Sequence, residues 1–277
     1  MQILAFIAIS AITYLIYSLV KAKGKERKRF TKPETVLLHQ VSPTALSVSG
    51  SPFCLKLETF LRMTKIPYEN EYGMKFSKKG KVPWIEFNGQ EIADSNFCIR
   101  FLMKEFRVDL DTHLNWTDRA IGHSIRTMLE ENFYWTMSHY CWFSDHAAEM
   151  REKLLGQLFP PLKYLAYFML KRQVKNYLWS HGMGRHNEQE IYGIAETDLL
   201  AVSGILGQKK FLFGDKPCLA DAGLFAFTAC SAWELPASPF AKIIRTKATN
   251  LGEHAQRMKE LYYPDWDRII SKKNKSE

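Results

Sequence analysis

The chain has 277 residues, 46% of them hydrophobic and 13% aromatic, so it can form one large or two ordinary domains and wholesale disorder is excluded. Eight of its nine net positive charges lie in residues 1–32 and 271–277, which argues against a nucleic-acid-binding body. Its five cysteines are widely spaced and form no CxxC motif, so the composition favours a reducing compartment without a disulfide framework.

Residues 1–20 are predicted to form a membrane anchor. Residues 3–20 contain no charge, glycine or proline, and as a helix these 18 residues would span roughly 27 Å, near the lower limit for a bilayer. A cleaved signal peptide is the alternative, but a positive n-region and a clear cleavage site are lacking. The basic segment 21–34 is expected to be a linker that keeps the body cytosolic by the positive-inside rule.

Residues 35–110 are predicted to form a small α+β domain with the element order β-α-β-β-β-α. The apolar run 35–40 indicates a first strand, which a loop rich in Ser, Pro and Gly follows. Apolar residues at helical spacing then predict a helix, with Ser51 as its N-cap and Pro52 in its first turn.

The second half of this domain is predicted to contain a hairpin and a second helix. Residues 67–74 indicate a second strand. Asn88–Gly89 lies between two short apolar runs, as in a tight β-hairpin. Asp94 or Ser95 is expected to cap a helix that runs through Phe106.

Residues 111–265 are predicted to form an all-helical domain, followed by a basic tail over 266–277. The expected helical segments are 115–143, 147–180 with a break at Pro160–Pro161, 187–207 with a capping box, 216–233 and 241–263. The apolar stretch 159–170 contains two prolines and Lys163. It is therefore predicted to be a buried or interfacial helix rather than a second membrane span.

This order of elements resembles the glutathione S-transferase architecture, in which a thioredoxin-like domain precedes an all-helical domain. The resemblance rests on Ser51-Pro52-Phe53-Cys54 at a helix start, on Val82-Pro83 where the fold places a cis-proline, on Asp94-Ser95 and on Asp221 in "CLADAGLF". Asp221 matches that family's structural N-capping aspartate.

At closer range, "SPFCLKLETFLR", "KGKVPWIEFNGQEIADS" and "HGMGRHNEQEI" are similar to the failed axon connections family. With the anchor and this length, the chain most resembles its nematode cadmium-responsive branch. The metaxins, mitochondrial outer-membrane proteins of the same fold, are more distant relatives.

Ser51 and Cys54 are the candidate catalytic residues that this resemblance implies. A helix N-terminus stabilises a thiolate, and the Ser51 hydroxyl could donate a hydrogen bond to the thiolate of bound glutathione. Ser51 could instead only cap its helix. Cys54 occupies the second-cysteine position of a glutaredoxin-like tetrad, so it is either a monothiol nucleophile or a buried, inert residue.

Val82, Pro83, Asp94 and Ser95 are the candidate glutathione-binding residues. A cis bond before Pro83 would let the Val82 backbone pair with the cysteinyl part of the ligand. Asp94 and Ser95 would meet the γ-glutamyl end at a helix N-terminus, or would serve only as helix caps.

No metal site is predicted, although His139, Cys141, Asp145 and His146 lie close together in the sequence. On one helix these four positions do not share a face, and soft-metal sites gather several thiolates.

The resemblance implies a membrane-anchored, glutathione S-transferase-like protein of the cadmium or xenobiotic stress response, with glutathione as substrate or ligand. Whether it is an enzyme stays open. The alternative is a non-enzymatic, metaxin-like adaptor that binds a protein partner at a membrane surface, and a homodimer is a further option. The family suggests a lysosomal or other endomembrane location, with the mitochondrial outer membrane as the alternative. The long loop Val41–Gly50 could close the pocket.

Overall fold

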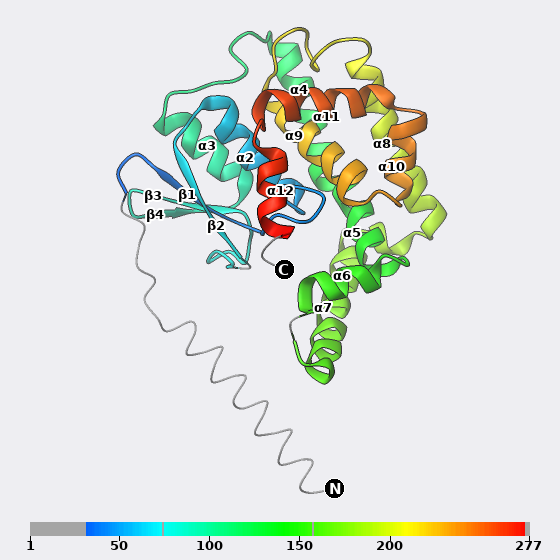
Figure 1. The fold of residues 1–277 in the computed structure, drawn as a ribbon. Coiled ribbons are helices and arrows are strands. Elements are labelled where there is room, and N and C mark those ends of the chain that lie inside the picture. Colours follow the sequence, from blue (N-terminus) through cyan, green and yellow to red (C-terminus); the bar gives the residue numbers. More distant parts are fainter. Residues whose placement is uncertain (1–31, 74, 157, 275–277) are drawn as a thin grey trace, which may run out of the picture.

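The fold is taken from a computed structural model, which describes residues 32–73, 75–156 and 158–274. The first domain contains a four-stranded sheet of order β2-β1-β3-β4 (Figure 1). β1 (Val36–Gln40) is parallel to β2 (Tyr68–Tyr72) and antiparallel to β3 (Trp84–Phe87), which forms a hairpin with β4 (Gln90–Ile92). Asn88 and Gly89 have φ values of 45° and 78°, the positive values that a tight hairpin turn requires, so the predicted hairpin is confirmed.

α2 (Pro52–Thr64) and α3 (Ser95–Glu105) pack against the sheet through a shared apolar core. α2 is the crossover that a parallel β1–β2 pair needs. The core is formed by Val36, Leu38, Leu57, Phe60, Leu61, Ile85, Phe87, Ile99 and Leu102, among others. Leu55, on the same helix, belongs to the core of the helical domain. α2 therefore lies between the two domains and is buried on both sides.

The rest of the described chain is helical, as predicted. α4 (Trp116–Met128), the π-helical turn η1 (Leu129–Phe133) and α5 (Tyr134–Phe143) continue one another. The remaining elements are α6 (Ala147–Leu155), α7 (Pro160–His181), η2 (Met183–Arg185), α8 (Glu188–Leu206), α9 (Leu219–Ala229), η3 (Cys230–Glu234), α10 (Pro239–Thr246), α11 (Thr249–Tyr262) and α12 (Trp266–Asn274). Every residue of α9 is buried, so this helix is the centre of the domain.

Asp221 holds the start of α9, the structural role expected for it. Its buried carboxylate accepts hydrogen bonds from the backbone N–H groups of Cys218 at 2.8 Å and Leu212 at 2.9 Å. The His254 Nε2 atom lies 2.9 Å from the same carboxylate. A negative charge at a helix N-terminus also complements the helix dipole. Asp221 thereby joins α9, α11 and the preceding loop.

A buried ion pair joins the two domains on one side of α2. Lys56 Nζ lies 2.6 Å from Glu130 Oε1 of η1, and the two side chains are 0% and 5% exposed. Asn96 accepts a hydrogen bond from Lys56 at 2.9 Å and donates one to Glu130 at 2.6 Å. Burial lowers the pKa of Lys56, although the Glu130 carboxylate opposes that effect.

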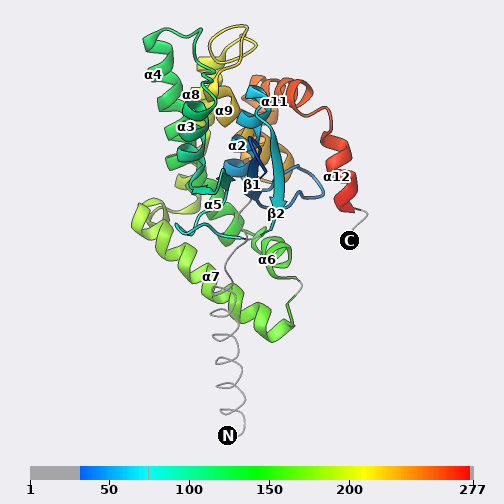
Figure 2. The ribbon, with the colours of Figure 1, turned by 90° about the vertical axis from the view of Figure 1, so that its left-hand side faces the viewer.

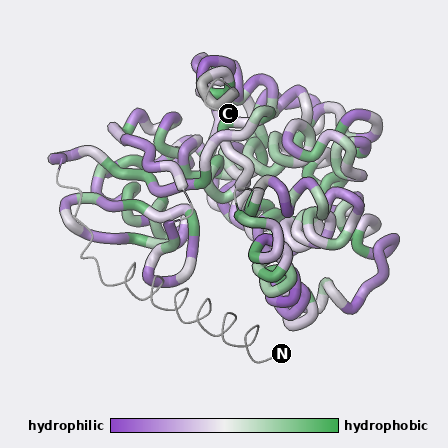
Figure 3. The backbone as a smooth tube through the Cα atoms, turned by 60° about the horizontal axis from the view of Figure 1, so that its bottom comes forward, coloured by the Kyte–Doolittle hydropathy of each residue, from purple (hydrophilic) through white to green (hydrophobic). Residues whose placement is uncertain are grey.

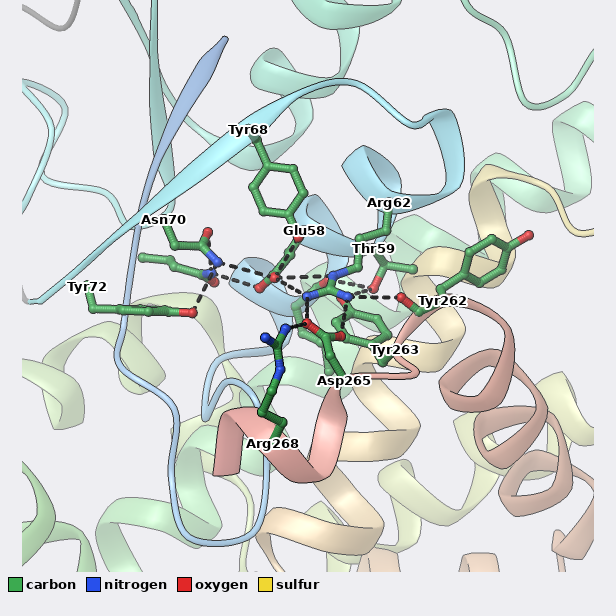
Figure 4. A network of polar contacts seen from close by, with 12 residues as sticks. Glu58, Thr59, Arg62, Tyr68, Asn70, Tyr72, Tyr262, Tyr263, Asp265 and Arg268 are labelled. Carbon is green, nitrogen blue, oxygen red and sulfur yellow. Dashed lines mark hydrogen bonds and ion pairs between the residues drawn. The ribbon is translucent and has the colours of Figure 1, made fainter. Parts of the chain in front are cut away.

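A second polar network joins the domains at the C-terminal end of α2 (Figure 4). Glu58 is 1% exposed and accepts hydrogen bonds from Gln40 at 2.7 Å and Tyr68 at 2.9 Å. Arg62 lies 3.1 Å from Glu58 and 2.7 Å from Asp265, just before α12. With the Lys56–Glu130 pair, this network fixes the position of the helical domain against α2.

Two sequence predictions need correction. The segment expected to be a basic tail forms α12 as far as Asn274, and Trp266 at its start is 3% exposed because it packs on Phe225 and Tyr263. The last helix predicted, 241–263, is two helices, α10 and α11.

The predicted membrane anchor and most of the linker lie outside the described residues. Among the helices that the structure describes, none combines the length and the apolar character needed to cross a bilayer.

Candidate functional site

A pocket of about 230 Å³ opens where α2 begins, between the two domains. The first domain contributes the start of α2 and the residue before Pro83, and the helical domain contributes α5, α6 and η3. The lining residues are Gly50, Ser51, Pro52, Phe53, Val82, Tyr134, Met137, Ser138, Cys141, Trp142, Met150, Cys230, Glu234 and Leu235. The wall from the helical domain is mostly apolar, which suits an apolar ligand group.

Ser51 is the N-cap of α2 and lines the pocket, so the predicted cap is confirmed. Its backbone is extended, with φ −116° and ψ 121°, and Pro52 is the first helical residue. The Ser51 Oγ atom accepts a hydrogen bond from the Cys54 N–H at 3.5 Å, a long distance for such a bond. The hydroxyl therefore lies at the positive end of the helix dipole and can donate to a ligand.

Val82 lines the same pocket. The Val82–Pro83 peptide bond is cis, as the sequence predicted, and Pro83 is buried directly before β3. Val82 itself is only partly buried and is one of the lining residues. The structure thus brings Ser51 and Val82, 31 positions apart in the sequence, to one pocket.

Asp94 and Ser95 lie at the start of α3 and are not among the residues that line this pocket. Asp94 caps the helix by accepting a hydrogen bond from the Asn96 N–H at 3.2 Å, and Ser95 is 3% exposed. Burial lowers the pKa of Lys56, and the negative charge of Asp94 partly opposes this effect. These contacts agree with the capping alternative for Asp94, and ligand binding by Asp94 and Ser95 stays a prediction.

The loop Val41–Gly50 is held against the helical domain. The Thr44 hydroxyl donates to Glu234 Oε2 at 2.6 Å, and Val48 belongs to the helical core. The pocket lies beside this loop, with Gly50 and Glu234 in its wall. The loop thus contributes to the pocket wall through Gly50, and the pocket beside it has a volume of about 230 Å³.

Tyr134 is a pocket residue that the sequence did not single out. It begins α5, and its ring packs edge-on against Phe53 with centroids 4.9 Å apart. Burial raises the pKa of Tyr134, so its hydroxyl stays protonated at neutral pH and can donate a hydrogen bond. The aromatic-rich segment 115–143 indicated a helix, but not which of its side chains would face a pocket.

Cys54 and Cys141 differ in solvent exposure. Cys54 lies in the first turn of α2, and Cys141 lies in the pocket beside it. Cys54 is 0% exposed, and burial raises the pKa of its thiol to about 11. This supports the buried alternative for Cys54 over the nucleophilic one. Cys141 is partly exposed and lines the pocket, while the other described cysteines are buried.

Alkylation of the native protein is therefore expected to label Cys141 first. A thiol pKa near 11 leaves Cys54 at neutral pH with about a hundredfold less thiolate than a thiol of ordinary pKa, and its burial slows the reaction further. The rates are measured by iodoacetamide labelling and peptide mass spectrometry at neutral pH. Equal rates at the two cysteines in the folded protein would contradict this assignment, and urea-unfolded protein provides the control with both thiols accessible.

The residues considered for a metal do not gather in the structure. His146 Nδ1 lies 3.0 Å from Glu149, and the His139 ring stacks on Phe143 with centroids 5.6 Å apart. Within the described part of the chain, no three histidine, cysteine, aspartate or glutamate side chains are placed to share a metal ion.

Comparison with known families gives two matches. Residues 52–148 match the glutathione S-transferase N-terminal domain, and residues 195–258 match the glutathione S-transferase C-terminal domain. The first match includes Ser51's helix, Val82 and Tyr134. Neither match covers residues 149–194.

Three curated proteins are similar over most of the chain. Failed axon connections of Drosophila melanogaster is 34% identical over 86% of this chain, which spans 60% of that protein. A metaxin-2 homolog of Caenorhabditis elegans is 30% identical over 62% of the chain and 76% of its own length. An isoprene-epoxide–glutathione S-transferase of Rhodococcus is 25% identical over 76% of the chain and 92% of its length.

Solved structures with the same fold include two further enzymes. The beta-etherase LigF of Sphingobium superposes with a TM-score of 0.59 at 16% identity, covering 86% of this chain and 99% of its own. Glutathione transferase GSTFuA3 of Phanerochaete chrysosporium superposes with a TM-score of 0.57 at 14% identity, and the superposition covers 85% of this chain and 100% of that one. At these identities the similarity concerns the fold.

Proposed function

Because the chain belongs to the glutathione S-transferase-like family that includes failed axon connections and the metaxins, we propose that it binds glutathione in the pocket between its domains. One observation carries this proposal: the capped start of α2 and the residue before the cis-proline line a single pocket with an apolar wall. Glutathione S-transferase is also part of the name of the Rhodococcus relative.

The chemistry available in the pocket suits thiol conjugation. A free thiol has a pKa near 8.5, so only a small fraction is thiolate at neutral pH. The N-terminus of α2 and the Ser51 hydroxyl would both favour the thiolate of bound glutathione. That sulfur would attack an electrophilic carbon held against the apolar wall, forming a C–S bond while the leaving group departs or an epoxide ring opens. Tyr134 lines the same pocket, and its protonated hydroxyl would donate a hydrogen bond to the developing oxyanion.

Filling the pocket is expected to abolish glutathione binding. Ser138 lies on α5 and lines the pocket, so Ser138→Trp places a large ring where the ligand would bind. Calorimetric titration of the full-length protein in mild detergent should show heat of binding for the wild type and an affinity at least about tenfold weaker for the variant.

Ser124→Trp is the matched control, because Ser124 is exposed on α4 and is not a pocket residue. Its titration should match that of the wild type. No heat with glutathione for the wild type, or equal affinity for all three proteins, would refute binding in this pocket.

The metaxin relatives support a second candidate function, an adaptor that binds a protein partner. The Arabidopsis thaliana relative, 23% identical, is named a mitochondrial outer membrane import complex protein. Under this alternative the pocket would bind no glutathione, and cross-linking in intact cells would recover a stable protein partner. The glutathione titration separates the two candidates.

The cellular setting is also part of the proposal. The apolar segment 3–20 supports a membrane anchor with the body on the cytosolic side. Metaxin relatives support the mitochondrial outer membrane as an address, beside the endomembrane location that the sequence resemblance implies. We extend the proposal to a role in cadmium or xenobiotic stress, for which conjugation of electrophiles is a suitable activity.

A further inference from the structure

α6 and α7 project from the body of the protein at the bottom of Figures 1 and 2. Both helices lie almost entirely in residues 149–194, which neither matched glutathione S-transferase domain covers. α7 is 22 residues long, yet only Tyr167 and Leu178 of it are buried. A helix with so little of its surface in the core is held in place by few contacts with the rest of the fold.

The first turns of α7 expose a patch of large apolar side chains. Among the described residues, 19 large hydrophobic side chains are exposed, and 9 of them fall within residues 154–170. We call the following set the α7 patch: Phe159 at 73% exposed, Leu162 at 37%, Leu165 at 55%, Phe168 at 63% and Met169 at 64%. Residues 162, 165 and 169 have the spacing of one helix face. The projecting part of the molecule shows hydrophobic turns among hydrophilic ones (Figure 3).

The side chains beside the α7 patch are basic. α7 contains no Asp or Glu. Lys171, Arg172 and Lys175 line a surface pocket of about 440 Å³ together with Phe143 and Phe168, so the cations adjoin the patch directly. No described carboxylate forms an ion pair with any of the three. Tyr177 and Trp179, further along the helix, are 52% and 57% exposed.

This combination of apolar and basic side chains favours an anionic lipid surface as the binding partner of α7. An apolar helix face next to cations and exposed aromatic rings is the pattern of a helix that lies in the interface of a membrane. A second copy of the chain would bring the same uncompensated cations to the contact, which disfavours self-association through this face. The sequence predicted residues 159–170 to be buried or interfacial, and the exposure of most of them favours the interfacial alternative.

We propose that α6 and α7 dock on the surface of an anionic phospholipid bilayer. The α7 patch enters the interfacial layer, and Lys171, Arg172 and Lys175 contact headgroup phosphates. The linker proposed above permits this, because residues 21–31 can reach at most about 40 Å from an anchor to the first described residue. The body would then have a fixed orientation on the membrane instead of rotating on its linker.

Photo-crosslinking to lipid tests the proposal on the full-length protein. The protein is reconstituted into vesicles of phosphatidylcholine alone or with phosphatidylserine, each containing a photoactivatable analogue of its own lipid. Mass spectrometry then locates the labelled peptides. In the anionic vesicles we expect label on peptides of residues 159–175 at a level at least about tenfold above that of the peptide with Trp116, an exposed residue away from α7.

Two matched variants separate charge on α7 from charge in general. In K171Q/R172Q/K175Q the lipid label on peptides of residues 159–175 should fall at least about tenfold. K209Q/K210Q/K216Q removes the same number of positive charges from the exposed loop after α8, and its label on these peptides should equal that of the wild type. Both variants should retain the wild-type circular dichroism spectrum and glutathione titration, since neither changes the pocket between the domains.

Three results would overturn the proposal. They are an absence of label on α7, equal label in neutral and anionic vesicles, and protein–protein crosslinks through residues 159–175 in place of lipid label.

Discussion

Replacing Glu130 by alanine is expected to lower the free energy of unfolding by about 3–5 kcal/mol at neutral pH, because it leaves the charged Lys56 buried without its counter-ion. The Lys56 side chain is 0% exposed, and Glu130 is the only carboxylate within ion-pair distance of it among the described residues. A loss of this size is a large part of the stability of an ordinary domain. Urea unfolding of the purified protein, followed by tryptophan fluorescence, measures it.

The same variant should show a characteristic pH dependence. Burial already lowers the pKa of Lys56 in the folded protein, and losing Glu130 lowers it further. Between the lowered pKa and the ordinary lysine value near 10.4, the unfolded chain binds more protons than the folded one, so stability rises with pH in that window. The destabilisation of Glu130→Ala relative to the wild type should therefore shrink as the pH is raised from 7 toward 10.

Two controls make this prediction specific. Glu131→Ala removes an exposed carboxylate one position away and should change stability by less than about 0.5 kcal/mol. The double variant Lys56→Met/Glu130→Gln removes both charges and keeps an amide partner for Asn96, so it should recover most of the loss. A loss below about 1 kcal/mol for Glu130→Ala, or a loss that does not change with pH, would show that the pair does not hold the domains together.

Most of the fold could be predicted because its signals are local. Asn88–Gly89 specifies a tight turn, Asp94 and Ser51 cap helices, and the capping box of Asn187 with Glu190 opens α8 as expected. Each of these depends on side-chain to backbone bonds within a few residues. α12 was missed because its sequence is mostly polar and because the helix is held by Trp266, whose burial depends on contacts distant in the sequence.

The contacts between the domains could not be predicted in the same way. In "LKLETF" Lys56 and Glu58 are charged residues, and such residues are almost never fully buried unless they are paired. The structure buries both because α2 is enclosed by the sheet on one side and the helical domain on the other. Tyr134 was missed for a related reason, since its place in the pocket is set by how α5 packs against α2.

Ser51→Ala is expected to lower kcat/KM for glutathione conjugation by about 10- to 100-fold at neutral pH. A hydrogen bond to a charged group contributes about 1.5–3 kcal/mol, which corresponds to roughly one to two pKa units for the bound thiol. Without the hydroxyl, the pKa of that thiol rises, so less thiolate is present at neutral pH. The activity of the variant should increase with pH and approach that of the wild type only above the raised pKa. A pH–rate profile with a general electrophile measures the shift.

Helix capping alone would give a different result, which makes the two roles of Ser51 separable. Loss of the cap costs about 1 kcal/mol of stability and would leave the pH–rate profile of the folded enzyme unchanged. Ser51→Thr keeps both the hydroxyl and a good capping residue, so it should restore the profile as well as the stability. An unshifted profile in Ser51→Ala, together with a normal profile in Ser51→Thr, would assign Ser51 to capping only. The start of α2 and its dipole would then be the remaining source of thiolate stabilisation in the pocket.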